Sequence, residues 1–258
     1  MPADGGIHAH PTRKLGRKAP TRDTSHLQLR RFLKKVPAAP RAVHWVPPGV
    51  RWGLMLNDAI GDCTIATCGH IIQAATGLEF GGPGHVVPDA AILDAYKAVS
   101  GYDGTDATDT GCVETDVLDY WRTHGVGGHR IWGWATIEPT DLPALKYAAA
   151  TFGNLCLGID MPAAWQGAKV WDVNPRGRAT GDWKPGSWGG HEVPLLAYDP
   201  DGGTVITWGA EVRITWEAFT TYVSEVHVVL GPDWCPSQRR PAPNGLDLHA
   251  LEAALAAV

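Results

Sequence analysis

The sequence lacks any hydrophobic run of the ~18 residues that a membrane-spanning helix requires, so we expect no membrane insertion. Its N-terminus, MPADGGIHAHPTRKLGRK, has no apolar stretch of the kind found in secretory signals, and we expect no signal peptide. The 5 cysteines form no compact disulfide or CxxC pattern, so reduced thiols are expected. A phosphate-binding GxxxxGK[ST] loop and a GxSxG nucleophile elbow are also missing.

Metal sites find little support in the sequence. The acidic segment Tyr102–Gly111 lacks the glycine and terminal glutamate of a calcium loop at their proper offsets. A solvated acidic loop is the commoner interpretation. Cys63 and Cys68 would lie about 140° apart around a helix, a poor geometry for zinc. We therefore predict no metal and no cofactor.

Positive charge is concentrated at the N-terminus. Residues 1–45 hold ten of the 22 Lys and Arg but only two of the 27 Asp and Glu. Their net charge is about +8, and the net charge of the remaining residues is about −13. Such a basic arm fits self-association, docking on an acidic protein or on its own body, or nucleic acid. Nucleic acid is the least favoured, because the arm has no interleaved aromatic residues.

Two stretches carry candidate chemistry. In the first, NDAIGDCTIATCGHIIQAATG (57–77), small and apolar residues recur at helical spacing from Cys63, and Gly77 is the expected stop. Cys63 would then begin a helix, where the helix dipole favours a thiolate, and Asn57 could donate to an oxyanion. The alternative is a small buried cysteine without function. In the second, GSWGGHEVPLLAYDPDGGTVITWG (186–209), His191 opens an apolar strand, and a second strand ends in Thr-Trp-Gly.

Together these stretches resemble the papain-like cysteine peptidases over roughly residues 39–231, and more narrowly phage and actinobacterial proteins of that family. Cys63 and His191 are 128 residues apart, as the family's long-range spacing requires. The positions that match the family pattern are Asn57, Gly61, Cys63, His191, Trp208 and Gly209.

The resemblance implies a Cys–His hydrolase of peptide or isopeptide bonds. Cys63 would be the nucleophile and His191 the base, Asn57 would form the oxyanion hole, and Trp208 would shield the imidazole. By the same resemblance, Gly111 and Cys112 would line the substrate cleft, with a peptide as the substrate.

One position departs from the family pattern. The asparagine that orients the histidine aligns with Ile206, which cannot hydrogen-bond through its side chain. Thr207 is adjacent but would point to the opposite face of a regular strand. We therefore expect His191 to be held by a backbone carbonyl, the Thr207 hydroxyl or water, and any hydrolysis to be slow.

The fold class expected is α+β, with a helical half and an antiparallel β-barrel-like half. The resemblance implies a cleft between the two halves. Helices are predicted near 63–77, 89–100, 111–125, 140–153 and 216–223, and strands near 155–159, 191–199, 204–208, 211–215 and 225–230. Residues 1–38 would form a basic arm outside the compact body, 39–231 the papain-like domain, and 232–258 a Pro-rich linker with a C-terminal helix.

A second hypothesis comes from another class of protein. A papain-like scaffold can serve as a catalytically weak or inactive structural or assembly protein, possibly of a phage particle, because a fold does not establish a function. The arm and the C-terminal helix would then be assembly elements. Both hypotheses are compatible with a cytoplasmic or a virion-associated protein.

Overall fold

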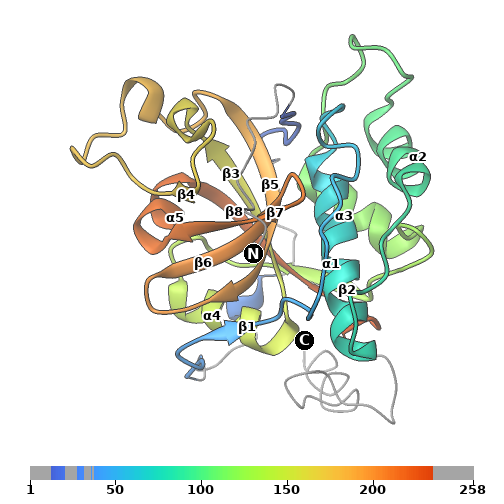
Figure 1. Cartoon of the computed structure of the whole chain (residues 1–258), viewed down its shortest axis with the longest axis horizontal. Coiled ribbons are helices and arrows are strands. Elements are labelled where there is room, and N and C mark those ends of the chain that lie inside the picture. The colour runs from blue at the N-terminus through green and yellow to red at the C-terminus, as the bar shows by residue number, and fades with distance from the viewer. Residues whose placement is uncertain (1–12, 21–27, 32–35, 37, 235–258) are drawn as a thin grey trace, which may run out of the picture.

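A central helix separates a group of helices from a sheet (Figure 1). The structure is a computed structural model that describes residues 13–20, 28–31, 36 and 38–234. Helix α1 (Cys63–Phe80) contacts strand β5 on one side and helices α2 (Asp89–Ser100) and α3 (Glu114–Thr123) on the other. Helices α4 (Leu142–Phe152) and α5 (Trp216–Tyr222) pack on the sheet. The predicted α+β class is confirmed.

The sheet has 8 strands in the order β2-β8-β3-β5-β6-β7-β4, with β1 paired to β5 off this path. All its pairs are antiparallel except β4 with β7. Among the described strands β2 and β4 end the order without pairing to each other, so the sheet is open and the predicted barrel-like closure is wrong. The strands are β1 (Val43–His44), β2 (Gly133–Thr136), β3 (Leu155–Met161), β4 (Val170–Trp171), β5 (Gly189–Tyr198), β6 (Gly202–Thr207), β7 (Ala210–Thr215) and β8 (Val223–Leu230).

Helix α1 begins at Cys63 as predicted but is not amphipathic. Every residue from Cys63 to Gly77 is buried, as in a helix surrounded by protein on all sides. The predicted stop at Gly77 is wrong, because the helix continues to Phe80 and ends at Gly81, whose φ of 74° is left-handed. Gly77 instead allows close packing, since a Cβ there would lie 2.7 Å from the ring of Pro47.

The remaining predicted elements are found within a few residues of their expected ends. Helix α2 ends at Gly101, and α3 buries Val117, Leu118 and Trp121 as expected. Helix α4 is capped by Asp141, whose carboxylate accepts from the backbone N–H of Ala144.

The terminal segments fall largely outside the described residues. Within the predicted basic arm, the structure describes a three-residue 3-10 helix, Leu29–Arg31. The predicted C-terminal helix lies outside the described residues. Trp234 packs in the core and its Nε1 donates to Thr151 O over 2.9 Å, so core packing extends beyond residue 231. The domain boundaries stay predictions.

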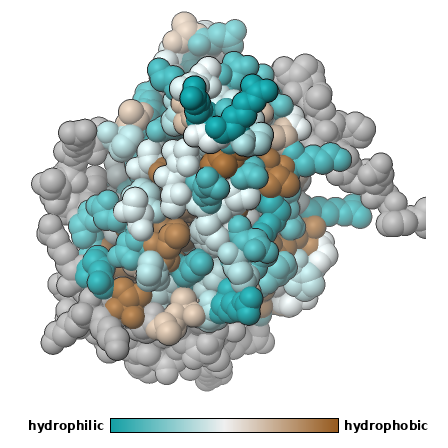
Figure 2. Space-filling model, turned by 90° about the vertical axis from the view of Figure 1, so that its left-hand side faces the viewer, coloured by the Kyte–Doolittle hydropathy of each residue, from teal (hydrophilic) through white to brown (hydrophobic). Residues whose placement is uncertain are grey.

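No helix in the described part of the chain is long and apolar enough to cross a membrane. On the face of the sheet half turned away from the helices, hydrophobic side chains lie scattered among hydrophilic ones (Figure 2). Isolated exposed apolar residues of this kind are ordinary for a protein surface.

Candidate functional site

Cys63 lies at the first position of α1 and is 1% exposed. Burial raises the pKa of its thiol to about 12, against the smaller opposing effect of the backbone N–H groups of Glu192 and Gly16. The expectation of a low pKa for the Cys63 thiol is therefore wrong for the structure as described, in which the thiol is buried. The helix dipole favours a thiolate, but removal of water from the sulfur outweighs it here.

His191 lies on β5, and both of its ring faces and both nitrogens are buried. Its Nε2 is 2.8 Å from the Thr207 hydroxyl oxygen, and Trp208 stacks on the ring at a centroid distance of 4.4 Å and an interplanar angle of 11°. The Nδ1 is buried and has no hydrogen-bond partner. Burial, followed by the positive charges of Arg17 and Arg13, lowers the pKa of His191 to about 3. The imidazole is thus neutral, with one nitrogen held and the other free for a ligand.

The Thr207 hydroxyl, one of the three expected partners, lies within hydrogen-bond distance of His191, whereas the family's orienting asparagine aligns with Ile206. Strands β6 and β7 are joined by the two-residue turn Trp208-Gly209, with positive φ values of 45° and 73°. Thr207 is the last residue of β6 and faces His191. Ile206 belongs to a separate apolar cluster with Ala74 and Leu196, so an asparagine there would not reach the imidazole.

Asn57 is 3% exposed, and its amide nitrogen donates to Asp62 Oδ1 over 3.2 Å and to Ile60 O over 3.4 Å. Asp62 precedes Cys63 and was missed by the sequence reasoning, although the motif GDC contains it. Burial raises the pKa of Asp62 well above its usual value, and its Oδ2 has no partner. The candidate oxyanion donor, Asn57, is thus hydrogen-bonded to the buried carboxyl of Asp62, the residue before Cys63.

The acidic loop contributes one residue to the site. Asp109 Oδ1 accepts from Gly61 N over 2.8 Å and from the Tyr96 hydroxyl over 2.6 Å, which fixes the turn before Cys63. Asp103 instead accepts from Thr105 and Thr108 within its own loop. Of the described residues, none of this loop belongs to a group spaced to hold a metal.

Residues 13–18 lie between the two halves of the fold (Figure 1, dark blue). Arg17 N donates to Gly190 O over 3.1 Å on the sheet side, while Cys112 N donates to Gly16 O over 2.9 Å on the helical side. The segment runs parallel to the chain at Cys112. The expectation that the basic arm lies outside the compact body is therefore wrong for these residues. Further hydrogen bonds join Lys14 N to Asn57 O (3.2 Å), Lys18 N to Cys112 O (2.8 Å) and Trp208 Nε1 to Lys14 O (3.3 Å).

Gly16 packs against the turn that precedes the nucleophile. A Cβ at Gly16 would lie 1.7 Å from Gly61 O, and a Cβ at Gly111 would lie 1.8 Å from Gly16 O. Only glycine fits at either position while the arm stays in place. Gly111 and Cys112 thus line the groove that the arm occupies; whether a substrate uses it stays a prediction.

Arg17 joins the arm to a buried acidic cluster. Its guanidinium donates to Glu225, Asp160 and Ser224, beside the buried carboxyls of Glu114 and Glu192. Two sets within the cluster have ligand atoms within 4.8 Å of one another, a spacing that suits a metal ion, namely Glu114, Glu225 and His227, and Glu114, Cys156 and Glu192. Arg17 supplies a positive charge here, so the cluster does not require a metal.

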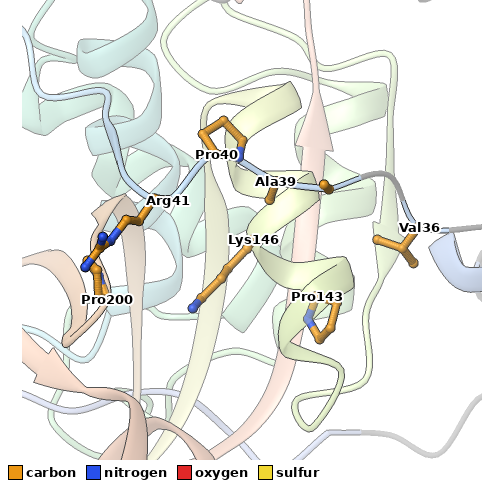
Figure 3. Close-up of a pocket in the computed structure, with 8 residues that line it drawn as sticks. Val36, Ala39, Pro40, Arg41, Pro143, Lys146 and Pro200 are labelled. Carbon is orange, nitrogen blue, oxygen red and sulfur yellow. The ribbon is translucent and has the colours of Figure 1, made fainter.

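A pocket of about 480 Å³ lies away from these residues, between the chain before β1, α4 and the turn at Pro200 (Figure 3). Its charged members are Arg41 and Lys146, and Lys146 Nζ lies 4.4 Å from the Trp216 ring centroid. Its lining includes no cysteine, histidine, hydroxyl or carboxylate side chain. Its lining consists of Val36, Ala38, Ala39, Pro40, Arg41, Pro143, Lys146 and Pro200.

Comparisons with protein-family models and with curated proteins gave no match. Solved structures did match. Xylellain, a cysteine protease from Xylella fastidiosa, superposes with a TM-score of 0.65 at 13% identity, over 85% of this chain and 97% of that one. Procathepsin L 3 of the Tenebrio molitor larval midgut superposes with a TM-score of 0.56 at 11% identity, over 86% of this chain and 77% of that one. The proCathepsin B S9 of Trypanosoma congolense superposes with a TM-score of 0.54 at 11% identity, over 86% of this chain and 88% of that one. The chain has a papain-like fold.

Proposed function

We propose that the protein is a peptidase-type cysteine hydrolase, with Cys63 as nucleophile and His191 as base, and that its N-terminal arm blocks the cleft. The observation that carries the proposal is the environment of His191. One nitrogen is bonded to Thr207, the ring is covered by Trp208, and the other nitrogen is buried without a partner. The backbone of the next residue, Glu192, acts to lower the pKa of the Cys63 thiol, so the two residues are neighbours in space.

In the reaction, His191 Nδ1 takes the thiol proton and the thiolate attacks the substrate carbonyl carbon. The oxyanion that forms is stabilised by the Cys63 backbone N–H and by Asn57, once the Asn57 amide turns from Asp62. The imidazolium returns the proton to the leaving amine as the C–N bond breaks. Water, deprotonated by His191, then hydrolyses the thioester and regenerates the thiol.

A peptide is the substrate class that fits the groove. The arm is held there mainly through backbone N–H and C=O groups, which any extended chain presents. Isopeptide bonds stay within the proposal, because the attacked carbonyl is the same.

The arm would hold the enzyme in a closed state. Its Gly16 lies near Cys63, and burial leaves the thiol and the imidazole both neutral. Two of the proteins with a similar fold are described as procathepsins, which agrees with a closed state. Displacing the arm would restore water to both groups and bring each pKa towards its usual value.

An inactive structural or assembly protein is the second candidate. It is favoured by the same burial, because a thiol whose pKa is raised to about 12 cannot act at neutral pH. Under this alternative the arm never leaves the cleft, and its displacement would produce no activity. No observation in the structure bears on a phage particle.

Peptide hydrolysis by an arm-displaced variant separates the two candidates. Gly16→Val cannot keep the arm in place, because even a Cβ would lie 1.7 Å from Gly61 O. We expect Gly16→Val to hydrolyse a mixed peptide library, and Gly16→Val/Cys63→Ala to be inert. Gly16→Val/Cys68→Ala, which removes a different buried thiol of the same helix, is the matched control and should retain the activity of Gly16→Val. No hydrolysis by folded Gly16→Val would favour the inactive protein.

A further inference from the structure

The side chain of Arg17 enters a pocket beside the cleft. Its Nη2 lies 2.7 Å from Asp160 Oδ1 and 2.8 Å from Ser224 Oγ, and its Nη1 donates to Glu225. The Arg17 side chain is 1% exposed and that of Glu225 is 7% exposed. Three acceptors on two adjacent strands therefore surround one planar cation.

The absence of a side chain at Gly158 creates the room for this cation. A Cβ there would lie 2.8 Å from Arg17 Nη1 and 2.4 Å from Glu225 Cγ. Gly158 is on β3, opposite Glu225 on β8, next to a register shift in their pairing. The pocket is thus built into the sheet and does not belong to the arm.

The charges around the pocket require a positive ligand. Glu114 is 0% exposed with both carboxyl oxygens lacking a hydrogen-bond partner, and Glu192 has one such oxygen. Burial raises the pKa of both groups well above the usual range, followed by the charges of Glu192 and Glu225 in the case of Glu114 and of Cys63 and Glu225 in the case of Glu192. Burial also acts to raise the pKa of Glu225, but a hydrogen bond with His227 and the charge of Arg17 outweigh it and lower it. Glu225 is therefore the ionised member, and without a cation it would be a buried, unpaired charge.

The position of the pocket relates it to the proposed reaction. Gly16, whose backbone acts to lower the pKa of the Cys63 thiol, is the residue next to Arg17 in the chain. A peptide that replaced the arm in the same groove would place a neighbouring side chain over Gly158. Guanidinium matches the acceptors better than ammonium, because it offers several N–H donors in one plane.

We propose that the pocket formed by Gly158, Asp160, Ser224 and Glu225 is a specificity subsite for arginine in the peptide substrate, and that Arg17 is its built-in occupant. This inference rests on the proposed function, because it names the substrate class of the same cleft. Glu225 is its principal specificity-determining residue. Displacement of the arm exchanges one guanidinium for another, so the buried charge is again paired when substrate binds.

The test uses the full chain carrying Gly16→Val. Fluorogenic peptides place arginine, citrulline or leucine at each of the three residues before the cleaved bond. Citrulline has the shape of arginine without its charge. We expect arginine at one of these positions to exceed citrulline by about 30-fold in kcat/KM. Adding Glu225→Gln should reduce that ratio below about 3-fold, whereas Glu138→Gln, an exposed control, should leave it unchanged. Equal rates for arginine and citrulline peptides would overturn the inference and leave the proposed function standing.

A binding measurement keeps the inference testable if no peptide is cleaved. In that case the proposed function fails, and thermal unfolding of the Gly16→Val protein with ethylguanidinium or ethylammonium, at equal ionic strength, decides the inference. We expect ethylguanidinium to raise Tm by about 2–4 °C more than ethylammonium, and the difference to vanish with Glu225→Gln. Should Glu225→Gln not fold, Asp160→Asn, whose side chain is 42% exposed in the native protein, should reduce the difference. Equal shifts from the two cations would overturn the inference.

Discussion

The Nε2 of His191 and the hydroxyl oxygen of Thr207 lie 2.8 Å apart, on adjacent strands of the sheet. This hydrogen bond fixes the imidazole ring and leaves Nδ1 as the nitrogen available to the nucleophile. Thr207 is accordingly a positioning residue that acts through His191. Its hydroxyl is one of the three partners that the sequence allowed.

Removal of the Thr207 hydroxyl should weaken catalysis without loss of folding. In the Gly16→Val background, Thr207→Val should lower kcat by about 10- to 100-fold with little change in KM, because the ring is less well oriented. Thr207→Ser should restore most of the activity. A merely structural role predicts instead that the valine variant is less stable and that kcat per folded molecule is unchanged.

Acid should destabilise the protein through its buried histidines. Burial lowers the pKa of His70 to about 4, although the bond to Gly53 O opposes this. A lowered folded-state pKa means that the stabilisation is complete above the unfolded value of ~6.5 and is lost as the pH falls towards 4. Each unit of difference in pKa corresponds to about 1.4 kcal/mol.

We therefore expect His70→Gln to reduce the loss of stability between pH 7 and pH 4.5, measured by urea unfolding. His124→Gln, at an exposed histidine, is the matched control and should follow the wild type. An identical pH dependence for wild type and His70→Gln would contradict the assignment.

The ion pair between Arg17 and Glu225 should hold the arm in the cleft. Arg17→Ala should lower the free energy of unfolding by about 1–3 kcal/mol and speed alkylation of Cys63, because the arm loses its buried anchor. Adding Glu225→Gln should recover part of the stability, since no unpaired carboxylate is then left. If the two single changes simply add, the residues are not coupled.

Asp109 should stabilise the turn that precedes the nucleophile. Asp109→Ala removes the acceptor of Gly61 N and of the Tyr96 hydroxyl, and we expect a loss of about 1–3 kcal/mol in the free energy of unfolding. Asp103→Ala, in the exposed part of the same loop, should cost less. Equal losses for the two variants would contradict the role given to Asp109.

The sequence predicted the elements that carry the site because local rules determine them. Cys63 follows a glycine turn at the start of a helix, and Thr-Trp-Gly ends a strand at a two-residue turn. The sequence left a backbone carbonyl, the Thr207 hydroxyl and water as alternative partners of His191, since counting along a motif cannot say which face of β6 turns to His191. Thr207 does, and Ile206 lies in an apolar cluster.

The arm in the cleft could not be predicted from local pattern. Gly16 and Arg17 stand in a basic segment without helical or strand periodicity, and Arg17 meets a partner 208 residues away. Glu114, Glu192 and Glu225 are widely separated in the chain, so their common burial emerges only with the fold. The low thiol pKa was wrongly expected for the same reason, because the burial of Cys63 also emerges only with the fold.

Alkylation of Cys63 by an electrophilic peptide probe, followed by mass spectrometry of the labelled site, tests the central claim most directly. The claim is that a reactive Cys63–His191 pair lies beneath the arm. In Gly16→Val the probe should label Cys63 at least about tenfold faster than in wild type at pH 7, and His191→Ala should remove that gain. Gly82→Val, at a glycine with no neighbour near its Cβ position, should label as slowly as wild type. Unchanged labelling of Cys63 in folded Gly16→Val, or labelling that does not depend on His191, would contradict the claim.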